Sequence, residues 1–229
     1  MLRPQDRAAG VNIQGYNADS DTGDDIWDGS AAYPFPAAAA ATTIVSASAD
    51  DTAAGDGGTG ARTVLVEGLD ANRRYISQVV SLNGATPVTL AGQYLRINHV
   101  VVVTAGSGGG NAGIIHVKHG ATVLAHLVAA ANMSSMAIYT LPAGSRGYLL
   151  GWRATSAGNA ILALQVRPPG GLWYTVDTLC LLAAGKSGQA FANEILPSFD
   201  AGSDFRVRAI LGADSMKVAA GFELAIAGS

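Results

Sequence analysis

The sequence predicts an all-β protein made of two antiparallel β-sandwich modules of jelly-roll-like type, preceded by an extended N-terminal arm. Two observations support this prediction: short apolar runs recur at even spacing and are separated by Gly-rich or Pro-rich turns, and no amphipathic helix interrupts them. With 229 residues, 49% of them hydrophobic, the chain can bury either one large β core or two cores of about 100 residues each. A single larger sandwich is therefore the alternative.

Residues 1–41 show little periodicity, and we expect them to form the extended arm. Pro34 and Pro36 lie where a regular central strand would need backbone N–H donors. Trp27, Tyr33 and Phe35 are the aromatic residues of this segment, and large aromatic side chains commonly anchor protein contacts. We expect these three to anchor the arm to an apolar surface, on the protein's own body or on a neighbour, and they are the predicted interface residues.

Residues 42–130 form the first predicted module. Its stretch 46–84 contains an acidic, glycine-rich loop, an alternating strand, a turn, a second strand and an Asn83-Gly84 turn, which is typical of antiparallel hairpins. We expect the acidic loop at residues 50–60 to be a contact or a surface excursion. The predicted strands of this module span residues 42–48, 62–67, 75–82, 94–104, 114–119 and 122–129.

Residues 131–229 form the second predicted module. Near the C-terminus the period of two is clear: Phe205, Val207 and Ala209 share one face, and Arg206 and Arg208 share the other. Such a pattern indicates a sheet with one buried and one solvated face. After a start at residues 136–144, the predicted strands span residues 148–155, 160–167, 172–182, 189–195, 205–211 and 216–226.

Composition and charge narrow the class of protein. Charged residues make up only 14% of a hydrophobic chain, which disfavours disorder, and a pI near 5.7 argues against a general nucleic-acid binder. Residues 1–70 hold 11 acidic residues against 3 basic ones, whereas the remainder holds 6 against 11. This asymmetry suits head-to-tail contact with copies of the chain, although a solvated acidic face is the simpler interpretation. We expect no signal peptide and no membrane span, because no stretch approaches 18 uninterrupted apolar residues.

Three motifs resemble nucleotide or protease signatures. Residues 108–113 satisfy G-x-G-x-x-G, but a strand rather than a helix is expected to follow, so we interpret them as a hairpin loop. Residues 185–187 imitate the end of a P-loop, but Cys180 stands where the earlier glycine would be needed. Asp21-Thr22-Gly23 lies in a polar segment rather than the apolar setting of an aspartic protease. We therefore expect no cofactor.

Metal and catalytic sites are also not expected. The acidic residues around Asp21 depart from the EF-hand spacing, and His116 and His119 should point to opposite faces of one strand, with His126 on the next. Cys180 is interpreted as a buried structural thiol. A hydrolase would need clustered carboxylates, and sequence order pairs none of the C-terminal ones. These are Asp177, Glu194, Asp200, Asp204 and Asp214.

Several phrases of the chain resemble virion structural proteins of tailed bacteriophages. They are DDIWDG at residues 24–29, SADDTAAGDGGTGARTVLVEGLD from residue 48, SLNGATPV from residue 81 and YLRINHVVVVTAGSGGGNAG from residue 94, followed by a strand-rich half with DFRVRA. The resemblance covers roughly residues 24–226. It implies a non-enzymatic protein made in the host cytoplasm and located on the capsid surface. Its expected role is that of a decoration or cement protein, commonly a homotrimer, that binds the major capsid protein and stabilises contacts between its subunits.

The same resemblance leaves other positions in the particle open. A head fibre, a tail adaptor or a tail spike that binds a host receptor or glycan is the alternative. In that case Trp152, Trp173 and Tyr174 would be the candidates for stacking on sugars, if exposed.

Overall fold

The computed structural model describes residues 9–55, 58–181, 186–190, 196–212 and 216–228. Over these residues the regular structure is entirely β-strand, without a helix, which confirms the predicted all-β class. Consequently, no helix capable of crossing a membrane occurs in the ranges just given. The chain divides into two compact units: unit 1 comprises residues 1–33 and 136–229, and unit 2 comprises residues 34–135.

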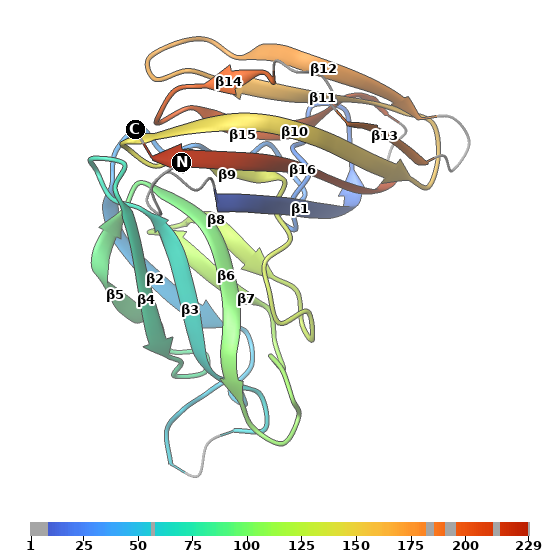
Figure 1. Cartoon of the computed structure of the whole chain (residues 1–229). Coiled ribbons are helices and arrows are strands. Elements are labelled where there is room, and N and C mark those ends of the chain that lie inside the picture. The colour runs from blue at the N-terminus through green and yellow to red at the C-terminus, as the bar shows by residue number, and fades with distance from the viewer. Residues whose placement is uncertain (1–8, 56–57, 182–185, 191–195, 213–215, 229) are drawn as a thin grey trace. The chain divides into compact units, whose positions relative to one another are not determined.

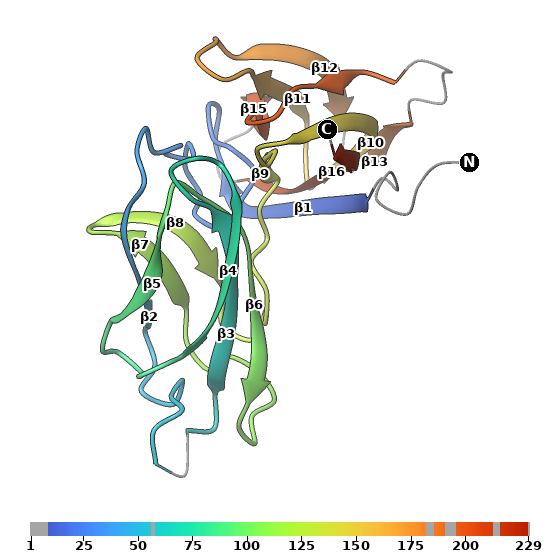
Figure 2. The same ribbon diagram turned by 60° about the vertical axis from the view of Figure 1, so that its left-hand side comes forward.

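Unit 2 contains two antiparallel sheets, of order β5-β2-β7-β8 and β4-β3-β6. Figure 2 shows β3 between β4 and β6. Apolar residues at alternate positions form the core, and Ile44, Val64 and Val117 are completely buried. The strands are β2 (Ala40–Ser46), β3 (Ala61–Leu69), β4 (Tyr75–Ser81), β5 (Val88–Tyr94), β6 (Arg96–Ala105), β7 (Ile115–His119) and β8 (Thr122–Leu127).

Unit 1 also contains two sheets, of order β1-β16-β10-β13, with β14 beside β10, and β12-β11-β15-β9. One hydrophobic core draws side chains from both sheets, including Leu164 of β11, Phe205 of β15 and Phe222 of β16, as in a sandwich. The strands are β1 (Ala9–Ser20), β9 (Ile138–Thr140), β10 (Ser145–Ser156), β11 (Ala160–Arg167), β12 (Tyr174–Leu181), β13 (Lys186–Ala190), β14 (Ser198–Phe199), β15 (Asp204–Gly212) and β16 (Met216–Gly228). Residues 191–195 of the predicted strand 189–195 lie outside the described residues.

The prediction that residues 1–41 form an extended arm does not hold for residues 9–20. Residues 9–20 form β1, which pairs antiparallel with β16 from Ala9 opposite Ile226 to Asn17 opposite Val218 (Figure 1, blue beside red). Gly15 allows close packing here, because a Cβ atom would lie 2.2 Å from the backbone nitrogen of Ala137. Most of the described part of the expected arm is therefore a strand and its continuation within unit 1.

The unit boundaries also differ from the predicted modules 42–130 and 131–229. The first 33 residues complete unit 1, so unit 2 is inserted between two parts of unit 1 rather than preceding it. Within unit 2 the sequence prediction missed β5 and began β6 two residues early, at residue 94. The jelly-roll connectivity stays a prediction.

Candidate functional site

A cluster of polar and charged side chains lies on the outer face of the sheet β12-β11-β15-β9. Phe205, Val207 and Ala209 of β15 point into the core, so Arg206 and Arg208 lie on the opposite face, as the alternation predicted. Strand register places Gln165 of β11 directly opposite Arg206, and Thr175 of β12 opposite Gln165. We call Gln165, Arg167, Thr175, Arg206 and Arg208 the arginine face.

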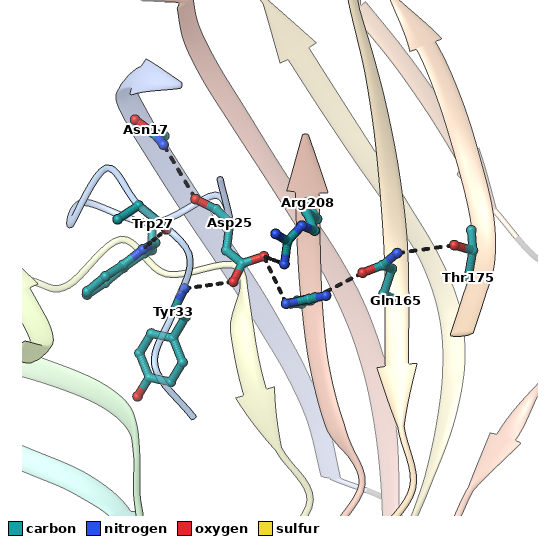
Figure 3. Close-up of polar contacts among 9 residues, drawn as sticks. Asn17, Asp25, Trp27, Tyr33, Gln165, Thr175 and Arg208 are labelled. Carbon is teal, nitrogen blue, oxygen red and sulfur yellow. Dashed lines mark hydrogen bonds and ion pairs between the residues drawn. The ribbon is translucent and has the colours of Figure 1, made fainter. Parts of the chain in front are cut away.

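The segment after β1 contributes a buried carboxylate to this face. The N–H of Ile26 donates to the carbonyl of Val207 at 2.8 Å, and Asp25 forms an isolated bridge opposite Arg208. The Asp25 side chain is completely buried, and its Oδ2 accepts the N–H of Tyr33 at 2.7 Å. Its Oδ1 lies 3.5 Å from Nη1 of Arg206 and 3.7 Å from Nη1 of Arg208 (Figure 3).

Burial dominates the electrostatics of this carboxylate. Desolvation raises the pKa of Asp25 to about 6, and the positive charges of Arg206 and Arg208 and the Tyr33 hydrogen bond only partly oppose that shift. Desolvation also lowers the pKa of Arg206, while the charge of Asp25 raises it. Each partner therefore offsets part of the other's cost of leaving water, which is how buried charges are tolerated.

The arginine face also fixes Trp173. The guanidinium carbon of Arg206 lies 4.0 Å from the centroid of the Trp173 ring, and that of Arg167 lies 4.8 Å from it, so both form cation–π contacts. Nε of Arg206 donates to Oε1 of Gln165 at 2.9 Å, and Nε2 of Gln165 donates to Oγ1 of Thr175 at 3.3 Å (Figure 3). Contacts with Trp173 and Gln165 thus fix the position of the Arg206 side chain.

A second carboxylate completes the cluster at the start of β15. Asp204 is buried, and its Oδ2 accepts from both Nε and Nη2 of Arg167, at 3.1 and 2.6 Å. Its Oδ1 accepts the hydroxyl of Thr140 at 2.6 Å. Asp25 and Asp204 therefore both face guanidinium groups. The arrangement holds the segment 23–26, the sheet and the β11–β12 hairpin in one position, and it is suited to displaying a rigid surface.

The three predicted interface aromatics are buried in the chain itself. Trp27 and Tyr33 belong to unit 1, where their rings meet edge to face with centroids 5.2 Å apart, and Nε1 of Trp27 donates to the carbonyl of Ala31 at 2.7 Å. Phe35 belongs to unit 2, and the guanidinium of Arg96 lies 5.5 Å from its ring centroid. They anchor their segment to the protein's own body, and their role in contact with a partner stays a prediction.

The predicted sugar-stacking aromatics differ strongly in accessibility. Trp152 is part of the unit 1 core, and its Nε1 donates to Oδ2 of Asp177 at 2.7 Å. Trp173 is covered by two guanidinium groups, whereas Tyr174 is 45% exposed. Of these three, Tyr174 is the most exposed, and Trp173 is partly buried.

The C-terminal carboxylates that the structure describes have separate partners. Asp177 bonds Trp152, Asp200 makes a surface ion pair with Arg146, and Asp204 bonds Arg167. Glu194 and Asp214 lie outside the described residues. The arginine contacts make Asp200 and Asp204 members of separate ion pairs.

The prediction that Cys180 is a buried thiol is wrong. Leu179 and Leu181 take the inward positions of β12, so the side chain between them is exposed. In the P-loop-like motif, Lys186 and Ser187 lie in β13, and Gly185 lies outside the described residues.

The histidines form a pair rather than a triad. His116 of β7 and His126 of β8 are opposite in register, with ring centroids 4.7 Å apart, and His119 is three positions further along β7. Burial lowers the pKa of His116 to about 4, so this residue is neutral at pH 7. In the described part of the chain, no three metal-ligating side chains come together.

Sequence reasoning missed a carboxylate that organises the loops of unit 2. Asp51 is completely buried, and its two oxygens accept hydrogen bonds from the N–H groups of Ala61, Ala112 and Gly113 and from the hydroxyl of Ser46. It joins the acidic loop to the loop at residues 108–113, so residues 50–60 are in part a structural junction. The available signal was the glycine content of both loops.

Glycine is required where these loops meet. A Cβ atom on Gly106 would lie 2.1 Å from the carbonyl oxygen of Gly58, and one on Gly58 would lie 1.9 Å from that of Asp50. Backbone thus packs directly on backbone. The loops leave a cleft of about 280 Å³ beside Asn111 and Asn132, which bond each other through backbone N–H and side-chain oxygen in both directions.

Comparison of the chain with protein-family models, with curated proteins and with solved structures found no match.

Proposed function

We propose that the protein is a non-enzymatic structural component of a tailed-bacteriophage virion. In this role it is a decoration or cement protein on the outer shell, binds the major capsid protein and stabilises contacts between its subunits. The sequence phrases at residues 24–29, 48–70 and 94–113 support the class of protein. The all-β build of two units supports the role, because two compact bodies in one chain can contact two neighbours at once.

The observation that carries the proposal is an exposed sheet face in unit 2. On the outer face of β4-β3-β6, strand register puts Leu65 between Val79 and Val101, and Val79 is 56% exposed. Hydroxyl side chains border this apolar row on one side, where Thr63 and Thr104 bond each other at 2.6 Å.

Charged groups border the same row on its other side. Glu67 accepts a hydrogen bond from the hydroxyl of Tyr75, and its Oε2 lies 3.1 Å from Nδ1 of His99. An apolar centre with a polar rim is the usual composition of a protein contact. We assign this face of β4-β3-β6 to the capsid contact.

Stabilisation of the shell then follows from mass action. A protein that binds only the assembled shell stabilises it by about 2.7 kcal/mol per site when its free concentration is a hundred times the Kd. The rigidity of the sheet favours binding to the shell, because an ordered sheet loses little entropy on binding. The expected partners are the major capsid protein and other copies of the chain, with the trimer implied by the resemblance.

The test measures binding to shells assembled without the protein. We expect the wild-type chain to occupy them and to raise their melting temperature, and we expect Val79→Asp to reduce occupancy at least about 10-fold, because it buries a charge in the contact. Thr122→Asp, at an exposed position of β8, is the matched control and should bind normally.

Two outcomes would reject the proposal. The first is a wild-type chain that is folded but does not bind shells. The second is equal occupancy by Val79→Asp and wild type, which would remove the assigned face. Deletion of residues 1–41 is unsuitable as a test, because it removes β1 from the unit 1 sheet.

A further inference from the structure

A histidine pair lies at the edge of one sheet of unit 2. His116 of β7 and His126 of β8 are directly opposite each other in register, and β8 is the last strand in the order β5-β2-β7-β8 (Figure 2). The register of this hairpin shifts by one residue between Val117 and Lys118, which is a β-bulge. Without the shift, His116 would lie opposite Ala125. The bulge therefore creates the pair, and bulges commonly re-aim a side chain next to a functional site.

The spacing of the two rings suits a single metal ion. Their centroids are 4.7 Å apart, and their planes are inclined at 79°. A bond from a metal ion to an imidazole nitrogen is about 2.0–2.1 Å long, and the ring centre lies about 1 Å further on, so two imidazoles on neighbouring positions of one ion have centroids about 4.5–5 Å apart. The observed distance lies in this range. Both rings can therefore reach one ion by side-chain rotation, without a change in the strands.

One nitrogen of the pair lacks a hydrogen bond. Nδ1 of His116 is shielded from solvent, and no protein group among the described residues bonds to it. Buried polar atoms are nearly always satisfied, and an exception calls for an explanation such as a bound ion. An ion on the pair is an explanation that also uses the ring opposite, because His126 supplies a second nitrogen.

Both rings are in the protonation state that binds metal ions. Burial lowers the pKa of His116 to about 4 and also lowers the pKa of His126, so both imidazoles are neutral at pH 7. The charge of Lys118, two positions along β7, acts on His116 in the same direction. A neutral imidazole offers its lone pair to Zn²⁺, Cu²⁺ or Ni²⁺, whereas Mg²⁺ and Ca²⁺ prefer oxygen ligands. Lys118 also repels any cation, so the pair favours ions that bind nitrogen strongly.

We propose that His116 and His126 together bind one divalent transition-metal ion of the Zn²⁺, Cu²⁺ or Ni²⁺ class. Among the described residues no third histidine, cysteine or carboxylate joins them, so water completes the coordination. The ion links β7 to the edge strand β8, and it stabilises the folded hairpin because the site forms only when the strands are paired. This binding does not rest on the virion role, since it needs only the isolated protein.

The experiment measures binding of Cu²⁺ and Zn²⁺, each added as the metal alone, to the full chain at pH 7. Every protein carries Cys180→Ser, because Cys180 is exposed and a thiol binds both ions. Isothermal titration calorimetry should give one site per chain with a Kd below about 100 μM, and each ion should raise the melting temperature. Mg²⁺ should do neither. The electron paramagnetic resonance spectrum of the Cu²⁺ complex should show two imidazole nitrogens.

Four variants in this background locate the site. His116→Gln and His126→Gln each remove one ligand and should weaken binding at least about 10-fold. His119→Gln is the matched control, three positions along β7 from His116, and should bind as the parent does. Lys118→Gln removes the opposing charge and should tighten binding. Thermal melting in the presence of a chelator checks that each variant is folded.

Three results would overturn the proposal. The first is the absence of a site of this affinity for either ion. The second is binding that is unchanged by His116→Gln and by His126→Gln, which means an adventitious ion only. The third is a Cu²⁺ spectrum with fewer than two imidazole nitrogens, which decides the matter even where a glutamine variant does not fold. The capsid contact is tested independently by Val79→Asp, so failure of the metal site leaves the proposed function standing.

Discussion

Two buried carboxylates organise the two units in different ways. Asp51 in unit 2 and Asp25 in unit 1 are both completely buried. Asp51 accepts short hydrogen bonds from uncharged groups, namely the N–H of Ala61 at 2.7 Å, that of Ala112 at 2.7 Å, that of Gly113 at 2.9 Å and the Ser46 hydroxyl at 2.5 Å. Asp25 accepts one backbone N–H and otherwise faces two guanidinium groups at 3.5 and 3.7 Å.

The difference shows two ways to offset the cost of burying a carboxylate away from water. The donors around Asp51 are mostly backbone groups, so the carboxylate fixes the path of two loops whatever charged residues surround it. The charges around Asp25 are carried by long side chains. The stability that this cluster contributes therefore depends on the ionisation of Asp25 and on the other contacts that hold the two arginines. The predictions below test this difference.

The largest effect is expected from Asp51→Ala. Four donors lose their acceptor together, three of them fixed backbone N–H groups, so we expect a loss of about 4 kcal/mol or more in the free energy of unfolding of unit 2. Urea unfolding followed by circular dichroism measures it. The neighbouring Asp50→Ala, at an exposed position, should cost less than about 0.5 kcal/mol. Equal effects of the two substitutions would contradict the role of Asp51.

Arg206→Ala should cost about 3 kcal/mol, because it leaves buried Asp25 with only the more exposed Arg208 guanidinium and removes a cation–π contact from Trp173. Arg206→Lys should recover only part of this, since an ammonium group does not reproduce the planar contacts. The control is Arg153→Ala, which breaks an exposed pair with Glu223 and should cost at most about 1 kcal/mol. Tryptophan fluorescence during unfolding reports on both. A cost for Arg206→Ala no larger than the control would show that the cluster is not an energetic unit.

Asp25 should make its own contribution to the dependence of stability on pH. The pKa of Asp25 is about 6 in the folded protein, above the ordinary value of 3.8 for an aspartate, so the folded state binds the proton more tightly. The contribution of Asp25 to stability is therefore fully present below pH 3.8 and is lost as pH rises through 6, by about 2–3 kcal/mol.

His116 acts in the opposite direction, because burial lowers its pKa, so its contribution to stability is lost as pH falls. The measurement is therefore the difference between wild type and Asp25→Asn in unfolding free energy at pH 4.5 and pH 7. This difference should favour wild type more at the lower pH. A difference that does not change with pH would contradict the raised pKa.

Arg208→Ala is expected to have the smallest effect, about 1 kcal/mol. Its side chain is 26% exposed and its Nη1 lies 3.7 Å from the Asp25 carboxylate, so solvent weakens the interaction. A double-mutant cycle with Asp25→Asn isolates the pair. A coupling as large as that of Arg206 with Asp25 would show that the two guanidinium groups are equivalent despite their different exposure to solvent.

The late strands could be predicted from sequence because their alternation is complete. Phe205, Val207 and Ala209 form an unbroken inward row, and the structure places all three in the core. β1 could not be predicted in the same way. It offers Val11 and Ile13 as its aliphatic inward residues, and its partner β16 is about 200 positions away.

Only the strand residues of the candidate site could be predicted, for the same reason. Alternation put Arg206 and Arg208 on one face, but their partner Asp25 comes from a short pairing with the edge of β15 that has no local pattern. The role of Asp51 could not be predicted for a different reason. In the sequence it is one of two adjacent aspartates, and only the approach of the loop at residues 108–113 makes it the buried one.

The pairing of β1 with β16 also fixes the order of events on the ribosome. β1 leaves the exit tunnel before unit 2 does, yet its partner β16 is synthesised about 200 residues after it. Unit 2 is one continuous segment and is complete by residue 135, so it can fold before the partner strand of β1 has been synthesised. During that interval the unpaired edge of β1 is open to strands of other nascent chains. A chaperone that holds this segment would therefore raise the yield of native protein more than one that acts on unit 2.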